Sequence, residues 1–82
     1  MNYKEWLASR THKVNGILGG TRVFKGTRLQ VIFIGAMAQE EDAATIYERY
    51  DYLLPGDVEN AKLYWQTKYM KVNGFIVPRV HN

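Results

Sequence analysis

Apolar residues recur at intervals of three and four in the middle of the chain, which is the spacing of one face of an α-helix. The first such stripe consists of Ala43, Ile46, Tyr47 and Tyr50. Asp42 directly precedes this stripe, and its carboxylate can accept a backbone N–H of the first turn. We therefore expect Asp42 to cap a helix that begins at Ala43.

A second stripe follows after a short connection and predicts a longer helix. Its members are Val58, Ala61, Trp65 and Tyr69. Pro55 precedes them, and because proline needs no amide donor at the first helical position, it is expected to open this helix. Two helices joined by about four residues, with the second one longer, have the spacing of a helix-turn-helix unit.

Two further segments are predicted to be helical. Tyr3 to Ser9 is expected to form a short helix with Trp6 and Leu7 on its apolar side. Leu29 to Met37 is too apolar for a surface helix, so a buried helix of about two to three turns is expected, with a strand as the alternative because of its β-branched residues. Thr27 is expected to cap this helix.

Turn residues divide the segment before Leu29 into short pieces. Asn15-Gly16, Gly19-Gly20 and Gly26 separate Ile17-Leu18 from Val23-Phe24. Short apolar pieces between such turns predict a strand or a hairpin.

At the C-terminus, the turn Asn73-Gly74 is expected to end the longer helix, and Phe75-Ile76-Val77 to form an extended segment that stops at Pro78. These elements predict a mainly α fold: a three-helix, helix-turn-helix-like core, preceded by a short β-hairpin or strand element and followed by a short extended C-terminal tail. We expect one domain over residues 1–82, with its core at about 17–70 and its tail at 71–82.

The net charge of +3 is unevenly distributed. Residues 1–34 contain six basic residues and one acidic residue, residues 35–59 contain seven acidic residues and one basic residue, and residues 60–82 contain four basic residues and no acidic one. Basic ends are suited to phosphates, whereas the acidic middle repels them. The acidic middle could face a basic partner protein or remain solvated.

Candidate chemistry is sparse. The chain has no cysteine, which excludes disulfides and thiolate metal sites. His12 and His81 have no His, Asp or Glu at ligand spacing, and no Ser/His/Asp arrangement appears, so we expect no metal, no cofactor and no enzymatic activity. The start of the chain has no targeting segment, and the apolar run from Val31 to Ala38 is far shorter than the roughly 20 residues that span a bilayer. The expectation is a soluble, cytoplasmic protein.

The most specific motif is the stretch from Gly19 to Val31, which runs Gly-Gly-Thr-Arg-Val-Phe-Lys-Gly-Thr-Arg-Leu-Gln-Val. It resembles the signature of a family of small bacterial domains, domain of unknown function 433, whose pattern is Gly-Gly-x-Pro-Val-x-x-Gly-Thr-Arg-(Ile/Val/Leu)-Pro-Val. Ile46 to Tyr50, Leu53 to Val58 and Tyr64 resemble later elements of that pattern. The resemblance covers roughly Ile17 to Trp65.

The resemblance implies a helix-turn-helix-like domain with a small β element ahead of it. Members of the family are often VapB-type antitoxins, which bind and neutralise PIN-like ribonuclease toxins and bind their own operator as dimers. The chain departs from the pattern at Arg22 and Gln30, where the family has prolines, and at Leu54, where it has a threonine cap. A glycine between the first two helices is also missing. These departures identify the chain as a divergent member, whose fold is expected to carry over better than any particular partner.

Nucleic-acid contact is expected from basic residues outside the start of the longer helix. In a helix-turn-helix unit, the first residues of the second helix meet base edges. Here they include Asp57 and Glu59, which phosphates repel, so DNA contact is either lost or moved elsewhere. The candidate nucleic-acid contacts are Arg22, Lys25, Arg28, Lys62 and Lys68.

The leading hypothesis is an antitoxin-like small protein that acts as a homodimer. It would bind a PIN-like ribonuclease toxin and also DNA, as a transcriptional autoregulator. Phe75, Ile76 and Val77 are the expected partner contacts, because an extended segment can add a strand to the sheet edge of another chain. Two alternatives stay open. One is a transcription regulator without a toxin, and the other is a non-enzymatic structural or protein-interaction module of a mobile element that keeps the fold but has lost DNA binding.

Overall fold

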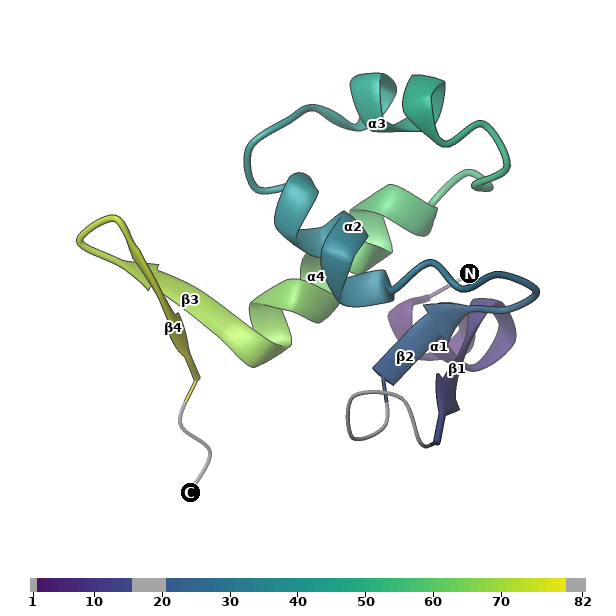
Figure 1. Ribbon diagram of the computed structural model, residues 1–82, viewed down its shortest axis with the longest axis horizontal. Helices are drawn as coiled ribbons and strands as arrows, with labels where there is room; N and C mark the ends of the chain where they lie inside the picture. Colours follow the sequence, from purple (N-terminus) through teal and green to yellow (C-terminus); the bar gives the residue numbers. More distant parts are fainter. Residues whose placement is uncertain (1, 16–20, 80–82) are drawn as a thin grey trace.

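The longest helix, α4 (Asp57–Lys68), is the element against which the other helices pack. The computed structural model describes residues 2–15 and 21–79. Its elements, in chain order, are α1 (Tyr3–Arg10), β1 (Thr11–Val14), β2 (Thr21–Phe24), α2 (Val31–Met37), α3 (Ala43–Arg49), α4, β3 (Tyr69–Val72) and β4 (Phe75–Pro78). Figure 1 shows α2 and α4 crossing at the centre, with α3 above them and the two hairpins on opposite sides.

The buried core lies along α4. Val58, Ala61 and Trp65 of its predicted stripe are buried, as the spacing predicts. The buried hydrophobic side chains from other elements that pack into this cluster are Trp6, Phe24, Val31, Ile34, Ala38, Ile46 and Leu53. Each large apolar side chain removed from water in this way stabilises the fold by about 1.5–3 kcal/mol, so the helices depend on one another far more than on their intrinsic propensities.

The segment Leu29–Met37 resolves as a helix, so the strand alternative is wrong. The helix α2 begins at Val31, two residues later than expected, and Gln30 precedes it without a side-chain cap. Thr27 does not cap this helix. Instead its hydroxyl accepts a hydrogen bond from the Leu29 amide at 3.0 Å and donates to the Phe24 carbonyl at 2.9 Å, which closes the turn after β2.

Close approach of α2 to α4 depends on Gly35. A Cβ atom at this position would lie 2.4 Å from the carbonyl oxygen of Ala61 and 2.7 Å from the Cβ of Trp65. Because no side chain fits there, only glycine lets the two helices cross at this distance.

The expected helix at Ala43 is confirmed as α3. The Asp42 side chain accepts the Thr45 amide at 2.8 Å, so the predicted cap is also confirmed. Ile46 is fully buried, and Tyr47 and Tyr50 are half-buried against the core.

Two details of the prediction for α4 are wrong. Pro55 does not open the helix, because the left-handed backbone of Gly56, with φ of 92°, interrupts any helical path and makes Asp57 the first helical residue. The helix also does not continue to the Asn73-Gly74 turn: it ends at Lys68, and Tyr69, which was expected on its buried stripe, has an extended backbone and begins β3.

The predicted β element before α2 is present as an antiparallel hairpin. β1 pairs with β2, with Thr11 opposite Phe24 and Lys13 opposite Arg22. The expected piece at Ile17-Leu18 lies outside the described residues, and the partner of β2 is Thr11–Val14, a strand that the sequence analysis did not predict. The helix expected at Tyr3 to Ser9 is confirmed as α1, which passes directly into β1.

The extended segment expected at Phe75-Ile76-Val77 is present as β4, but it is not an isolated tail, because β3 and β4 form a second antiparallel hairpin. Its turn consists of Asn73 and Gly74, which both have positive φ, at 51° and 82°. Two such residues between paired strands are typical of a type I′ turn. The Arg79 amide extends the ladder by donating to the Lys68 carbonyl at 2.9 Å.

The predicted fold class therefore needs correction. The described residues contain four helices and two antiparallel hairpins, which is a mixed α and β architecture and not a mainly α, three-helix core of helix-turn-helix type. The difference has a physical cause: α1, α2 and α3 all pack against α4, and its first residues, Asp57 and Val58, are buried, so the start of the longer helix lies in the core and is not presented on the surface.

Candidate functional site

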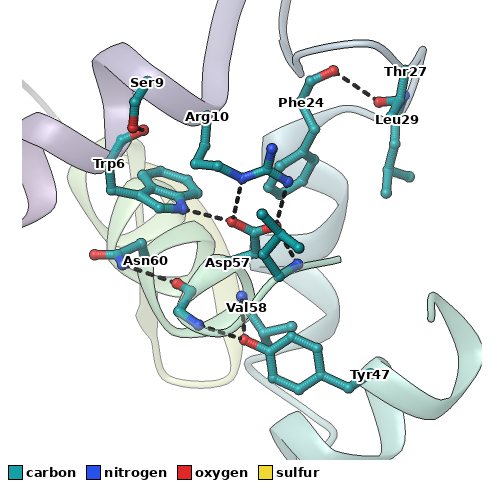
Figure 2. Close-up of polar contacts among 12 residues, drawn as sticks. Trp6, Ser9, Arg10, Phe24, Thr27, Leu29, Tyr47, Asp57, Val58 and Asn60 are labelled. Carbon is teal, nitrogen blue, oxygen red and sulfur yellow. Dashed lines mark hydrogen bonds and ion pairs between the residues drawn. The ribbon is translucent and has the colours of Figure 1, made fainter. Parts of the chain in front are cut away.

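The first turn of α4 is held by one fully buried carboxylate, that of Asp57 (Figure 2). Arg10 donates to both of its oxygens, at 3.1 Å from Nε and 2.8 Å from Nη2. The indole Nε1 of Trp6 donates to Oδ1 at 2.8 Å, and the backbone amide of Leu54 donates to Oδ2 at 2.8 Å. These bonds join α1 to the start of α4, and they satisfy a charge that would otherwise be costly to bury.

The protonation of Asp57 follows from these contacts. Burial alone would raise the pKa of its carboxyl group, but the hydrogen bonds from Arg10, the Leu54 amide and Trp6, together with the charge of Arg10, hold that pKa below its ordinary value. The same pair raises the pKa of the Arg10 guanidinium. Asp57 is therefore ionised at neutral pH and acts as a structural anchor.

The Tyr47 hydroxyl binds the neighbouring backbone of the same turn, as Figure 2 shows for Val58. It accepts the amides of Gly56 at 3.0 Å and Val58 at 3.1 Å, and it donates to Glu59 at 2.6 Å. Gly56 has no side chain to cap α4, so Tyr47 of α3 supplies this function from outside the helix. Burial and the hydrogen bond to Glu59 raise the pKa of Tyr47, although the two amides oppose the rise.

The backbone amides and side chains at the start of α4 are consequently occupied by contacts within the protein. Asp57 and Val58 are buried, and Glu59 is bonded to Tyr47. Base edges of DNA could not reach the buried Asp57 and Val58 without unfolding the turn, and the exposed Glu59 would repel phosphates.

The five candidate nucleic-acid contacts do not form one patch. Arg22 and Lys68 line a common cleft. Lys25 instead donates to the Ala8 carbonyl at 2.8 Å, near the C-terminal end of α1, where a cation is favourable. Arg28 lines a different hollow, and Lys62 is exposed on α4.

These five cations have in common that none of them forms an ion pair with a carboxylate of the described residues. The ion pairs among the described residues join Arg10 to Asp57, Arg49 to Glu41 and Lys71 to Glu40. No carboxylate within the described ranges therefore neutralises any of the five basic residues Arg22, Lys25, Arg28, Lys62 and Lys68.

The fold also separates the two signs of charge. The acidic residues around α3, at positions 40–42, 48 and 51, lie with that helix at the top of the view in Figure 1, whereas the basic β1–β2 hairpin lies below and to the right. An approaching polyanion would meet a favourable potential at the hairpin and an unfavourable one at α3.

The three expected partner contacts lie on β4. Phe75 and Ile76 have 73% and 58% of their surface exposed, and Val77 is half-buried. Val72, directly opposite Phe75 on β3, is also exposed. Figure 1 shows this hairpin projecting away from the helices, so the tip presents a small apolar surface on both strands.

We also searched the described residues for a metal site and for a membrane-spanning helix. Across residues 2–15 and 21–79, no three His, Asp or Glu side chains lie close enough together to hold a metal ion. In the same part of the chain, no helix has the length and apolar content needed to cross a membrane.

Sequence reasoning missed several residues of this arrangement. Trp6 and Arg10 are four residues apart on α1 and therefore share a face, which was a usable signal for a joint contact. Nothing local connects them to Asp57, which is 47 residues beyond Arg10 in the chain. Lys13 was also missed, because its importance comes from lying opposite Arg22 in the hairpin.

The architecture defines a small α and β domain in which two hairpins flank a helical centre. The family model described as "Protein of unknown function (DUF433)" matches residues 13–65, which is more than half of the chain, so the protein belongs to this family. The match begins in β1 and ends at Trp65 in α4, and it therefore includes the cleft residues Arg22 and Tyr64. No curated protein and no solved structure shows significant similarity to the chain.

Proposed function

We propose that this protein is an antitoxin-like adaptor of the cytoplasm that binds a partner protein through the tip of the β3–β4 hairpin. The observation that carries the proposal is the exposure of Phe75 and Ile76, two large apolar side chains on opposite faces of β4, of which Phe75 shares its face with the exposed Val72 opposite it on β3. Single exposed apolar residues are common on protein surfaces, whereas several of them gathered at the end of a projecting element are typical of an interaction site.

The energetics of the hairpin support the same conclusion. A two-stranded hairpin alone is at best marginally stable in water. Among the described residues, its sheet contains only β3 and β4, so both outer edges are open to a further strand. A partner that pairs with one edge and covers Phe75 would supply the missing hydrogen bonds and apolar burial.

The resemblance to antitoxin domains supplies the identity of the proposed partner, which is a PIN-like ribonuclease, and it favours a homodimer as the active form. Operator recognition through α4 gains no support, because its first turn is buried and acidic. The proposal therefore rests on protein–protein contact. Its rival is a non-enzymatic structural or protein-interaction module of a mobile element, which keeps the fold but has lost DNA binding.

Co-expression with the product of the neighbouring gene, which the proposal expects to be a PIN-like nuclease, tests the proposal. The wild-type protein should co-purify with the tagged nuclease, and a Phe75→Ser/Ile76→Ser double variant should not. Phe33→Ser is the matched control, because Phe33 is equally apolar and 50% exposed but lies on α2. The proposal is overturned if the wild-type protein does not co-purify, or if the double variant binds as well as the control.

A further inference from the structure

A cleft between β2 and the last turns of α4 gathers cations and aromatic rings from distant parts of the chain. Its volume is about 170 Å³, and it is lined by Thr21, Arg22, Ile32, Tyr64, Lys68 and Tyr69. Pockets for drug-sized ligands and cofactors measure about 300–1,000 Å³, so this cleft suits one planar ring and not a whole cofactor. It lies away from both the Asp57 anchor and the tip of the β3–β4 hairpin.

The basic side of the cleft is held in place by the hairpin. One Nη atom of Arg22 donates to the Thr11 hydroxyl at 2.8 Å, which fixes the guanidinium at the protein surface. Lys13 lies directly opposite Arg22 in the β1–β2 ladder, and cross-strand partners project from the same face. Two like charges opposite each other destabilise a hairpin, and no carboxylate among the described residues pairs with either cation. A bound anion would remove this repulsion.

Lys68 adds a third cation from the other wall of the cleft. Its ammonium nitrogen lies over the Tyr64 ring, 5.6 Å from the ring centre, so a cation–π contact holds the charge beside this ring. Burial and the nearby Tyr64 raise the pKa of Tyr3, and the hydrogen bond with Thr67 and the charge of Arg22 only partly oppose this rise.

The aromatic side of the cleft consists of Tyr64 and Tyr69, which are both half-buried. Tyr69 packs on Trp65 with 5.6 Å between ring centres, so its orientation is supported from behind. A planar base can stack on such a ring while its phosphate meets the cations beside it. The sequence alone gave no sign of this combination, because Arg22 and Tyr64 are far apart in the chain.

We propose that this cleft binds single-stranded nucleic acid, with the phosphate backbone between Arg22, Lys13 and Lys68 and one base stacked against Tyr64 and Tyr69. Stacking requires an unpaired base, which a duplex does not offer. The contacts involve the backbone and a ring face, so binding is tolerant of sequence. This activity is independent of the proposed partner binding, because the tip residues Phe75 and Ile76 do not line the cleft.

Fluorescence anisotropy with labelled oligothymidylate and oligouridylate of about 10 nucleotides tests the proposal, with a duplex of equal length for comparison. Both single strands should bind, and the duplex should bind at least about 5-fold more weakly. The logarithm of the affinity should fall with the logarithm of the salt concentration, with a slope of about −0.7 for each phosphate contacted. Absence of single-strand binding at low salt, or tighter binding of the duplex, would overturn the proposal.

Three variants locate the site. Lys68→Gln and Tyr64→Leu should each weaken binding by roughly 5-fold or more, and Lys68→Gln should also make the salt slope shallower. Lys62→Gln is the matched control, because it removes the same charge from the same helix outside the cleft and should leave the affinity within about 2-fold. Equal losses for Lys62→Gln and Lys68→Gln would show general charge attraction and would refute the cleft. Co-purification with the nuclease should be unchanged in all three variants, so failure here is distinguishable from failure of the proposed function.

Discussion

Arg10 and Asp57 are 47 residues apart in the chain, yet the guanidinium of Arg10 forms two hydrogen bonds to the fully buried carboxylate of Asp57. This pair joins the first helix to the helix at the centre of the core. Trp6 and the Leu54 amide complete the coordination of the carboxylate, so the position of α4 relative to α1 depends on one charged group.

Removing this charge should cost much of the stability of the protein. Asp57→Asn leaves Arg10 and the Trp6 indole with an incomplete acceptor in a buried site, and breaking such a pair destabilises a protein by about 3 kcal/mol. A chain of this length is stable by only about 4–12 kcal/mol, so the urea midpoint should fall sharply. Glu41→Gln, which breaks the exposed pair with Arg49, is the control and should move the midpoint much less. Equal shifts for the two variants would contradict the anchoring role of Asp57.

The same pair predicts the pH dependence of stability. The folded pKa of Asp57 lies below its ordinary value of 3.8, so its contribution is complete above the unfolded pKa and is lost as the pH falls through the folded value. The free energy of unfolding should therefore be constant near neutrality and decrease below about pH 4.

Two exposed carboxylates, Glu41 and Asp42, also have lowered pKa values and add to this decrease. Salt screens the attraction between Glu41 and Arg49, whereas the hydrogen bonds from Thr45 to Asp42 and the contacts of buried Asp57 persist. Urea denaturation at several pH values in high salt should therefore show a smaller acid-induced loss for Asp57→Asn than for the wild-type protein. Parallel curves for the two proteins would argue against the linkage to Asp57.

For Gly35→Ala, the direction of the stability change shows whether α2 and α4 are closely packed at this position. In an ordinary helix interior, glycine to alanine is stabilising by about 1 kcal/mol. At Gly35 the new methyl group would collide with the backbone of Ala61, so overpacking should destabilise the protein by about 1–3 kcal/mol. Thermal unfolding followed by circular dichroism should show a melting temperature lower by at least about 4 °C. A higher melting temperature would mean that α2 and α4 are not closely packed here.

Tyr47 provides a prediction about the start of α4. Tyr47→Phe keeps the ring but removes the acceptor of the Gly56 and Val58 amides, so stability should fall by about 0.5–2 kcal/mol, as for the loss of a helix cap. Hydrogen exchange should accelerate at Val58, since its amide loses its partner. Tyr52→Phe is a suitable control, because Tyr52 is half exposed and lies outside this turn. Unchanged exchange at Val58 would show that the hydroxyl does not cap the helix.

The sequence predicted the local parts of this fold well. Helical spacing identified α3, with Ile46 inward and Asp42 as its cap, because both signals lie within a few residues of each other. The buried positions Val58, Ala61 and Trp65 were found for the same reason. The spacing could not show that α4 is covered on several sides, since an amphipathic stripe identifies one buried face only.

The hairpins show where local reasoning failed. Thr11–Val14 has no regular alternation of apolar and polar residues, and it is a strand because β2 pairs with it. The Asn73-Gly74 turn is a strong hairpin signal, but Tyr69 was assigned to the helical stripe, so the strand before the turn was overlooked. The cleft combines Arg22 with Tyr64 and Lys68 through the tertiary fold, which no motif in the sequence encodes.

The junction between α4 and β3 has a consequence for the lifetime of the protein. Lys68 ends the helix and Tyr69 begins the strand, so no loop residue separates the projecting hairpin from α4. A partner bound to the hairpin would therefore also stabilise α4. Binding at the tip would protect the whole chain from proteases that cleave transiently unfolded molecules. The amount of this protein in the cell would then follow the amount of the partner that binds the tip, because unbound molecules would be degraded.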